Sequence, residues 1–183
     1  VTLDSFFEPA SEFLPPQTTD PIGNYAGTTC GGSMTEVFTR SCNIPFAQMA
    51  LELGPDRFQA GAERWGVGET VPIDMPRAAA STLGNFDDID QRLPLLAISG
   101  FGQAEVQMVP LHMAMVAATV ANDGVMLEPY VVDVELDHSG RVLRDARPDV
   151  WKRPITPETA AILEQLMVSV AQNGTASCCI GLE

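Results

Sequence analysis

Residues 39–46, TRSCNIPF, place a hydroxyl two positions before a carboxamide at the start of an apolar stretch. In a bent loop, Ser41 and Asn43 can direct their side chains into the same cleft. There the hydroxyl would relay a proton and the amide would hold a substrate carbonyl. Asn43 can equally cap a helix at 44–53, which is a frequent role of asparagine. Taken alone, this three-residue pattern favours the cap, so the rest of the sequence must decide.

Helix signals occupy much of the chain. Ser33 and Glu36 form a capping-box pattern, in which the hydroxyl accepts a backbone N–H and the carboxylate reaches back. The stretch at 110–122 is apolar on almost every side, which predicts a buried helix. We predict helices at 33–40, 44–53, 56–65, 110–122 and 156–171. In the last of these helices the inward face is predicted to hold Leu163, Leu166, Met167 and Val170.

Strand signals are few. Residues 1–29 are rich in Pro, Thr, Gly and Asn, which predicts an irregular connection with room for one short strand. Residues 67–95 also indicate a loop. At 132–136 apolar and acidic residues alternate, as in a half-buried strand, and a turn at 138–140 joins this strand to 141–143 as a hairpin. The fold class is therefore predicted to be α+β and rich in helix, as one domain or part of one.

The charge and the apolar pattern exclude some functions. The chain has 183 residues and a formal net charge of −14, from 24 acidic and 10 basic residues, which argues against binding nucleic acid. No apolar run is long enough to span a bilayer, so no membrane contact is expected from this segment. Lys152 is the only lysine. Val1 is not a methionine, so we expect a chain that is processed or cut from a longer one.

Four cysteines are present, at Cys30, Cys42, Cys178 and Cys179. They form no Cys-x-x-Cys pair, and no structural metal site is expected. Cys30 and Cys42 flank a short predicted helix and are the better disulfide candidates. Such a bridge would indicate an oxidising, extracytoplasmic setting. Four thiols without a bridge are an equally good interpretation.

Other polar groups favour structural roles. The glycines of residues 99–103 allow positive φ or close backbone approach, but the pattern is not a dinucleotide-binding loop. His112 lies on the predicted buried helix and fits the core better than a catalytic site. His138 lies in the hairpin turn and is expected to be solvated. No Gly-x-Ser-x-Gly nucleophile elbow occurs, and the acidic residues at 87–90 indicate a solvated face.

Taken together, the segments resemble class B penicillin-binding proteins, most closely the actinobacterial penicillin-binding protein A group. Four features occur in the family's order: the region around Ser-x-Asn, an aromatic-Gly-x-Gly after it, a Gly-Gln loop before a helix, and a late helix. They are NYAGTTCGG at 24–32, VFTRSCNIPFAQMALELG at 37–54, WGVG at 65–68, SGFGQAEVQMVPLHMAMVAATVANDGVMLEPYVV at 99–132 and TPETAAILEQLMVSV at 156–170.

This resemblance implies a portion of the penicillin-binding and serine β-lactamase-like transpeptidase fold. It implies a serine D,D-transpeptidase that cross-links peptidoglycan stem peptides and is acylated by β-lactams, without a cofactor. A nucleophilic serine needs an adjacent base and an oxyanion hole. On the matching positions, Ser41 is implied to relay protons and Asn43 to hold the substrate, with Cys42 as a spacer. The setting is implied to be the extracytoplasmic face of the membrane, beside other cell-wall synthesis proteins.

The sequence also departs from the family. It contains neither Ser-x-x-Lys nor Lys-Thr-Gly. Its only lysine, Lys152, is preceded three residues earlier by Asp149 instead of a serine, and it is followed by Arg153 instead of a threonine. NGTASCCIGLE, at 173–183, resembles the approach to the third motif. We therefore expect residues 1–183 to be the middle part of a transpeptidase domain and to form no acyl-enzyme alone. The alternative is a catalytically empty binding or scaffold module of the same fold. A β-lactam-sensing receptor requires the same missing serine, and a serine β-lactamase fits the segments less well.

Overall fold

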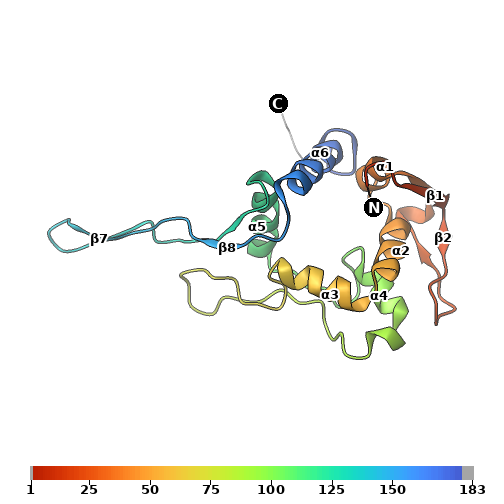
Figure 1. Ribbon diagram of the computed structural model, residues 1–183, viewed down its shortest axis with the longest axis horizontal. Helices are drawn as coiled ribbons and strands as arrows, with labels where there is room; N and C mark the ends of the chain where they lie inside the picture. Colours follow the sequence, from red (N-terminus) through yellow and green to blue (C-terminus); the bar gives the residue numbers. More distant parts are fainter. Residues whose placement is uncertain (1, 179–183) are drawn as a thin grey trace. The chain divides into compact units, whose positions relative to one another are not determined.

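Two units make up the part of the chain that the computed structural model describes, residues 2–178 (Figure 1). Among these residues, unit 1 holds 2–60, 83–106 and 162–178. Unit 2 holds 61–82 and 107–161. The candidate residues Ser41 and Asn43 therefore belong to unit 1, and the predicted hairpin belongs to unit 2. Val1 and the last part of NGTASCCIGLE, including Cys179, lie outside the described residues.

Unit 1 begins with short antiparallel strand pairs, where an irregular connection was predicted. β1 (Phe6–Ala10) pairs with β4 (Cys30–Ser33), and β2 (Glu12–Phe13) pairs with β3 (Ile22–Gly23). A 3₁₀ turn, η1 (Tyr25–Gly27), precedes β4. The prediction of one short strand is wrong: β1, β2 and β3 all begin within residues 1–29, and β2 and β3 are too short to show an alternating pattern. β1 and β4 pack closely, since a Cβ on Gly31 would lie 2.5 Å from Pro9 Cα.

The three helices that follow agree with the sequence signals. α1 (Met34–Thr39) begins at the predicted capping box, in which Ser33 N donates to Glu36 Oε2 at 2.7 Å and Glu36 N donates to Ser33 Oγ at 3.3 Å. α2 (Asn43–Leu53) ends at Gly54, whose φ is +79°. α3 (Pro55–Arg64) then follows. Short loops between α1, α2 and α3 place the Ser41 turn at the junction of two helices.

One helix of unit 1 lies where a loop was predicted. Within and just after residues 67–95, the chain forms the 3₁₀ turn η2 (Ile89–Gln91) and α4 (Leu93–Ser99). α4 packs on α2, and Leu96 is completely buried beside Ala50. The end of α4 approaches closely, since a Cβ on Gly100 would lie 2.6 Å from both Ala50 Cβ and the Phe46 carbonyl oxygen. This packing stabilises a short helix whose only local start signal is Pro94.

The last helix, α6 (Pro157–Asn173), starts as expected at Thr156, whose hydroxyl accepts from Thr159 N at 3.3 Å. Leu166 is buried, and Leu163 and Val170 are half-buried. Met167 is exposed, so its assignment to the inward face is wrong. The buried stripe of α6 is narrower than its apolar residues suggested.

Unit 2 centres on α5 (Pro110–Ala121) and the antiparallel pair of β5 (Met126–Leu127) and β8 (Val150–Lys152). Met115 and Met126 form its core with Val71. One face of α5 is buried, but Met113 on another face is 48% exposed. The prediction of a helix buried all round is therefore wrong for this chain, because the unit has few elements that could cover a second face.

The predicted hairpin is present in unit 2 as β6 (Val134–Leu136) and β7 (Val142–Asp145), and it extends away from α5 as a narrow arm (Figure 1). All of its strand residues are exposed, so the prediction of a half-buried strand is wrong. Across residues 2–178, no helix is both long enough and apolar enough to cross a membrane.

Candidate active site

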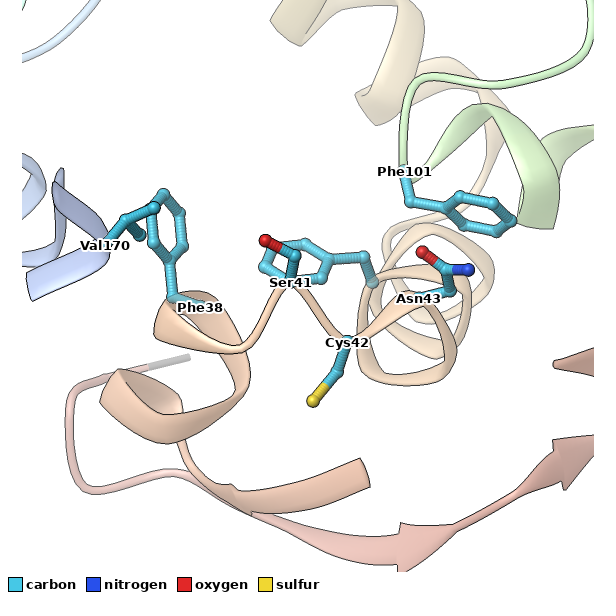
Figure 2. A pocket seen from close by; sticks show the side chains of 7 residues that line it. Phe38, Ser41, Cys42, Asn43, Phe101 and Val170 are labelled. Carbon is cyan, nitrogen blue, oxygen red and sulfur yellow. The ribbon is translucent and has the colours of Figure 1, made fainter. Parts of the chain in front are cut away.

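The turn between α1 and α2 holds Ser41 in a left-handed backbone conformation, with φ of +54°. This conformation disfavours any residue with a Cβ by about 1 to 2 kcal/mol, so neighbouring contacts must maintain it. Ser41 N donates to the Phe38 carbonyl at 3.1 Å, and Cys42 N donates to the Val37 carbonyl at 3.0 Å. As a result, Ser41 and Asn43 lie on one side of the turn and Cys42 points to the other (Figure 2). The side-by-side placement that the alternation predicted is present.

A disulfide attaches the turn to the strand region. Cys30 of β4 and Cys42 are bonded, with their Cα atoms 5.7 Å apart, and both are buried. They pack with Val37 of α1 in a small core. The middle residue of Ser-x-Asn is therefore more than a spacer, because it fixes the motif to β4.

Asn43 does not cap its helix, contrary to the prediction. It is the first residue of α2, and its side-chain Nδ2 donates to the Gly23 carbonyl at 3.0 Å. The cap comes from Asn24, whose Oδ1 accepts from Asn43 N at 3.0 Å and from Ile44 N at 3.3 Å. Asn24 Nδ2 also donates to the Ala10 carbonyl at 2.8 Å. A buried asparagine from the preceding loop thus satisfies the helix start and leaves the Asn43 carboxamide at the pocket.

An apolar pocket of about 290 Å³ opens over the motif. Ser41 and Asn43 are its polar lining, and aromatic rings supply most of its wall (Figure 2). Phe38 and Phe46 meet edge to face, with ring centroids 6.0 Å apart. Phe101 follows α4. Such a pocket can hold the uncharged part of a ligand while the hydroxyl and the amide orient a carbonyl.

A second hollow, of about 590 Å³, shares Ser41 and Asn43 with the first pocket but is more polar. Its lining includes Arg40, Gln103 and Thr175. The Ser41 hydroxyl lies 2.9 Å from the Thr175 hydroxyl, so these two groups share a hydrogen bond. Sequence reasoning did not assign any of these three residues to the site. All three lie in segments that carried the family resemblance: Arg40 in 37–54, Gln103 in 99–132 and Thr175 in NGTASCCIGLE.

Thr175 is held in place by contacts between α1 and the end of α6. The Thr39 and Ser169 hydroxyls lie 2.7 Å apart. Gly174 packs so tightly that an added Cβ would overlap the Thr39 carbonyl oxygen. Gly174 thus brings its neighbour Thr175 up to Ser41, and a side chain there would separate them.

His112 is a core residue, as predicted. It is completely buried, with Nδ1 2.8 Å from the Ser81 hydroxyl and Nε2 2.8 Å from the Trp65 carbonyl oxygen. Although Ser81 and His112 form a serine–histidine pair, both are inaccessible and the second ring nitrogen meets a carbonyl rather than a carboxylate. His138 is exposed in the hairpin turn, as expected. Among residues 2–178, no group of three or more His, Cys, Asp or Glu side chains could hold a metal ion.

Comparison with known proteins identifies a family for this arrangement. Residues 5–179 match the family model described as penicillin binding protein transpeptidase domain. The chain is 34% identical over 161 residues to the peptidoglycan D,D-transpeptidase PbpA of Mycolicibacterium smegmatis, which covers 86% of this chain and 32% of that protein. It is 33% identical over 134 residues to penicillin-binding protein 3 of Bacillus subtilis, covering 73% of this chain and 18% of that protein.

Solved structures also resemble this chain. The imipenem acyl-enzyme complex of penicillin-binding protein A from Mycobacterium tuberculosis matches with a TM-score of 0.88 at 27% identity, over 100% of this chain and 42% of that one. The predicted α+β fold class is confirmed by this match. The chain spans about a third of the length of the PbpA proteins it resembles.

Proposed function

Since the chain belongs to the penicillin-binding protein transpeptidase family, we propose that it forms part of a serine D,D-transpeptidase of peptidoglycan synthesis. Its substrates would be peptidoglycan stem peptides, and β-lactams would acylate the complete enzyme. One observation carries the proposal: Ser41 and Asn43 line the same pocket from one side of a turn (Figure 2). Ser-x-Asn is one of the family's active-site motifs.

The proposed chemistry is acyl transfer through a serine ester. A nucleophilic serine outside these 183 residues attacks the carbonyl carbon before the terminal D-alanine, and the peptide C–N bond breaks. Ser41 passes a proton to the departing amine, while Asn43 hydrogen-bonds a substrate amide and keeps the carbonyl in line. An amine of a second stem peptide then attacks the ester and returns the proton through Ser41, and the serine is released.

Residues 1–183 are proposed to be a middle portion of the domain and to form no acyl-enzyme alone. Lys152, the only lysine, is already engaged elsewhere. Its Nζ lies 2.7 Å from Glu69 Oε1 and 5.1 Å from the centroid of the Trp151 ring. A catalytic base must instead stand within hydrogen-bond reach of its serine, which favours a base supplied from outside these residues.

Labelling with a fluorescent penicillin tests the proposal. The full-length protein should be labelled, and the 183-residue chain should not. Ser41→Ala should lower the second-order rate of labelling by about 100-fold, as expected when a positioned proton relay is lost. Ser11→Ala removes an exposed hydroxyl from the same unit and should leave the rate unchanged. Unlabelled full-length protein, or a Ser41→Ala variant labelled as fast as the parent, would reject the function.

The alternative, a catalytically empty binding or scaffold module, predicts a gene without Ser-x-x-Lys and a full-length protein that is never labelled. For the enzyme, we propose action on the extracytoplasmic face of the membrane together with other cell-wall synthesis proteins. The Cys30–Cys42 disulfide supports that location, because disulfides persist in oxidising compartments.

A further inference from the structure

Among residues 2–178, Arg40 is the only charged residue that lines either of the two hollows at the motif. The chain as a whole has 24 acidic and 10 basic residues, so a cation at this place is opposite in sign to the net charge of the chain. Most of the other residues that line this hollow carry a hydroxyl or an amide group, including Ser41, Asn43, Gln103 and Thr175. Such a lining offers hydrogen-bond donors around one positive charge, which suits an anionic group.

The guanidinium of Arg40 is held by a backbone carbonyl, and Glu36 attracts it without forming a direct ion pair. Its Nη2 donates to the Thr29 carbonyl oxygen at 3.0 Å, which uses one of the five N–H donors of an arginine. Glu36 stands one helical turn earlier, but its Oε2 accepts from Ser33 N and Oγ at 2.7 and 2.8 Å. Within residues 2–178, Arg40 has no ion-pair partner. The remaining donors are therefore open to a ligand.

We propose that this hollow is a subsite for a carboxylate of the peptide substrate and that Arg40 determines specificity for it; this inference rests on the proposed transpeptidase function. Arg40 directly precedes Ser41. Because Arg40 and Asn43 line one hollow, we place the recognised carboxylate on the residue next to the amide that Asn43 is proposed to hold. A planar guanidinium can bind a carboxylate through two parallel hydrogen bonds, and the Gln103 carboxamide, which lines the same hollow, can add an uncharged donor.

A purely structural role for Arg40 makes a different prediction. Arg40 is the C-cap residue of α1, where a cation stabilises the helix end and its contact with Thr29 ties the loop. Under that role, replacement would lower stability and slow all substrates alike. Under the subsite role, replacement changes the ratio between a charged and an uncharged substrate.

The test uses full-length protein and two donor peptides ending in D-Ala-D-Ala, whose next residue inward is glutamate in one and glutamine in the other. The parent protein should prefer the glutamate peptide in kcat/KM by about 10-fold, the expected size for one hydrogen-bonded charge. Arg40→Met should bring the ratio to about 1, and Arg40→Lys should retain part of it. Arg57→Met, which removes an exposed arginine of α3 in the same unit, should keep the full preference.

If a protein does not turn over the peptides, equilibrium dialysis measures the same preference as the ratio of the two binding affinities. An Arg40→Met protein that retains the preference would overturn the subsite, and so would a parent protein without one. Penicillin labelling separates the two proposals. Normal labelling of Arg40→Met with an unchanged peptide preference rejects only the subsite, whereas failure to label the parent protein rejects the transpeptidase function.

Discussion

The carboxamide oxygen of Asn24 lies 3.0 Å from the backbone nitrogen of Asn43, so a residue outside α2 caps the helix that carries half of the Ser-x-Asn motif. The amide nitrogen of Asn24 meanwhile bonds the carbonyls of Ala10 and Thr28 at 2.8 and 3.0 Å. One buried side chain thus connects the end of β1, the loop before β4 and the start of α2. The position of Asn43 depends on this connection.

Asn24→Ala is expected to lower the free energy of unfolding by about 2 kcal/mol, because it removes a helix cap and leaves buried backbone groups without partners. Asn24→Asp retains the acceptor for α2 but loses both donors, so it should be intermediate. Asn122→Ala, which removes an exposed hydrogen bond to Val125, is the control and should cost less than 1 kcal/mol. Urea unfolding measures all three. Equal losses for Asn24→Ala and Asn122→Ala would contradict the capping role.

Local signals predicted the helices well, because their causes lie within a few residues. The Ser33 capping box and the prolines at the starts of α3, α5 and α6 act on the adjacent turn. α4 also has a proline near its start, Pro94, but it is only seven residues long, and its packing of Leu96 beside Ala50 has no local pattern. The hairpin itself was predicted, but its exposure was not, because alternation indicates a face that can be buried and not what buries it.

The candidate site, like the fold, could be predicted from the sequence only in part. The alternation of Ser41 and Asn43 showed that both side chains could face one side of the turn, although taken alone it favoured a helix cap. It could not reveal that the cap of Asn43 comes from 19 residues earlier, or that the hydroxyl partner of Ser41 is Thr175, 134 residues later. Hydrogen bonds between residues so distant have no local pattern. Family-level resemblance could name the motif but not its supports.

Removing the disulfide should loosen the motif as well as destabilise the fold. The bridge spans a separation of 12 residues, for which chain entropy predicts about 3 kcal/mol. The Cys30→Ser, Cys42→Ser double variant should unfold at lower urea and show faster amide hydrogen exchange at 41–43. Cys178→Ser replaces an exposed cysteine and leaves the bridge intact, so it should behave like the parent. Unchanged exchange at 41–43 in the double variant would show that the turn does not need the bridge.

Gly174→Ala tests whether the end of α6 positions Thr175. The new Cβ would overlap the Thr39 carbonyl oxygen, so the segment must shift and the Ser41–Thr175 hydrogen bond should be lost. We expect destabilisation of about 1 to 3 kcal/mol, as for other overpacked sites, and slower penicillin labelling of the full-length protein. Gly61→Ala is the matched control. Its Cβ meets nothing within 4 Å in helix α3, so this change should be neutral or stabilising by up to about 1 kcal/mol. Equal stability of the two variants would show that Gly174 is not tightly packed.

The attachment of the hairpin in unit 2 should depend on pH through Asp74. Its Oδ1 accepts from Val131 N at 2.7 Å and its Oδ2 accepts from Val132 N at 3.0 Å, just before β6. The N–H of Val132, and then that of Val131, hold the pKa of Asp74 below its ordinary value of 3.8. Because the folded pKa is depressed, the stabilisation is present above pH 3.8 and is lost as the pH falls through the folded value.

Amide NMR shifts of residues 131 and 132 should therefore stay constant from pH 7 to pH 4 and titrate with a midpoint below 3.8. Asp74→Asn keeps an acceptor oxygen but cannot titrate, so its shifts should not change across this range. Asp133→Asn, at an exposed neighbouring carboxylate, should leave the parent titration in place. A midpoint at or above 3.8 would mean that the two backbone donors do not favour the charged carboxylate. Ionisation of Asp74 would then not stabilise the attachment of the hairpin.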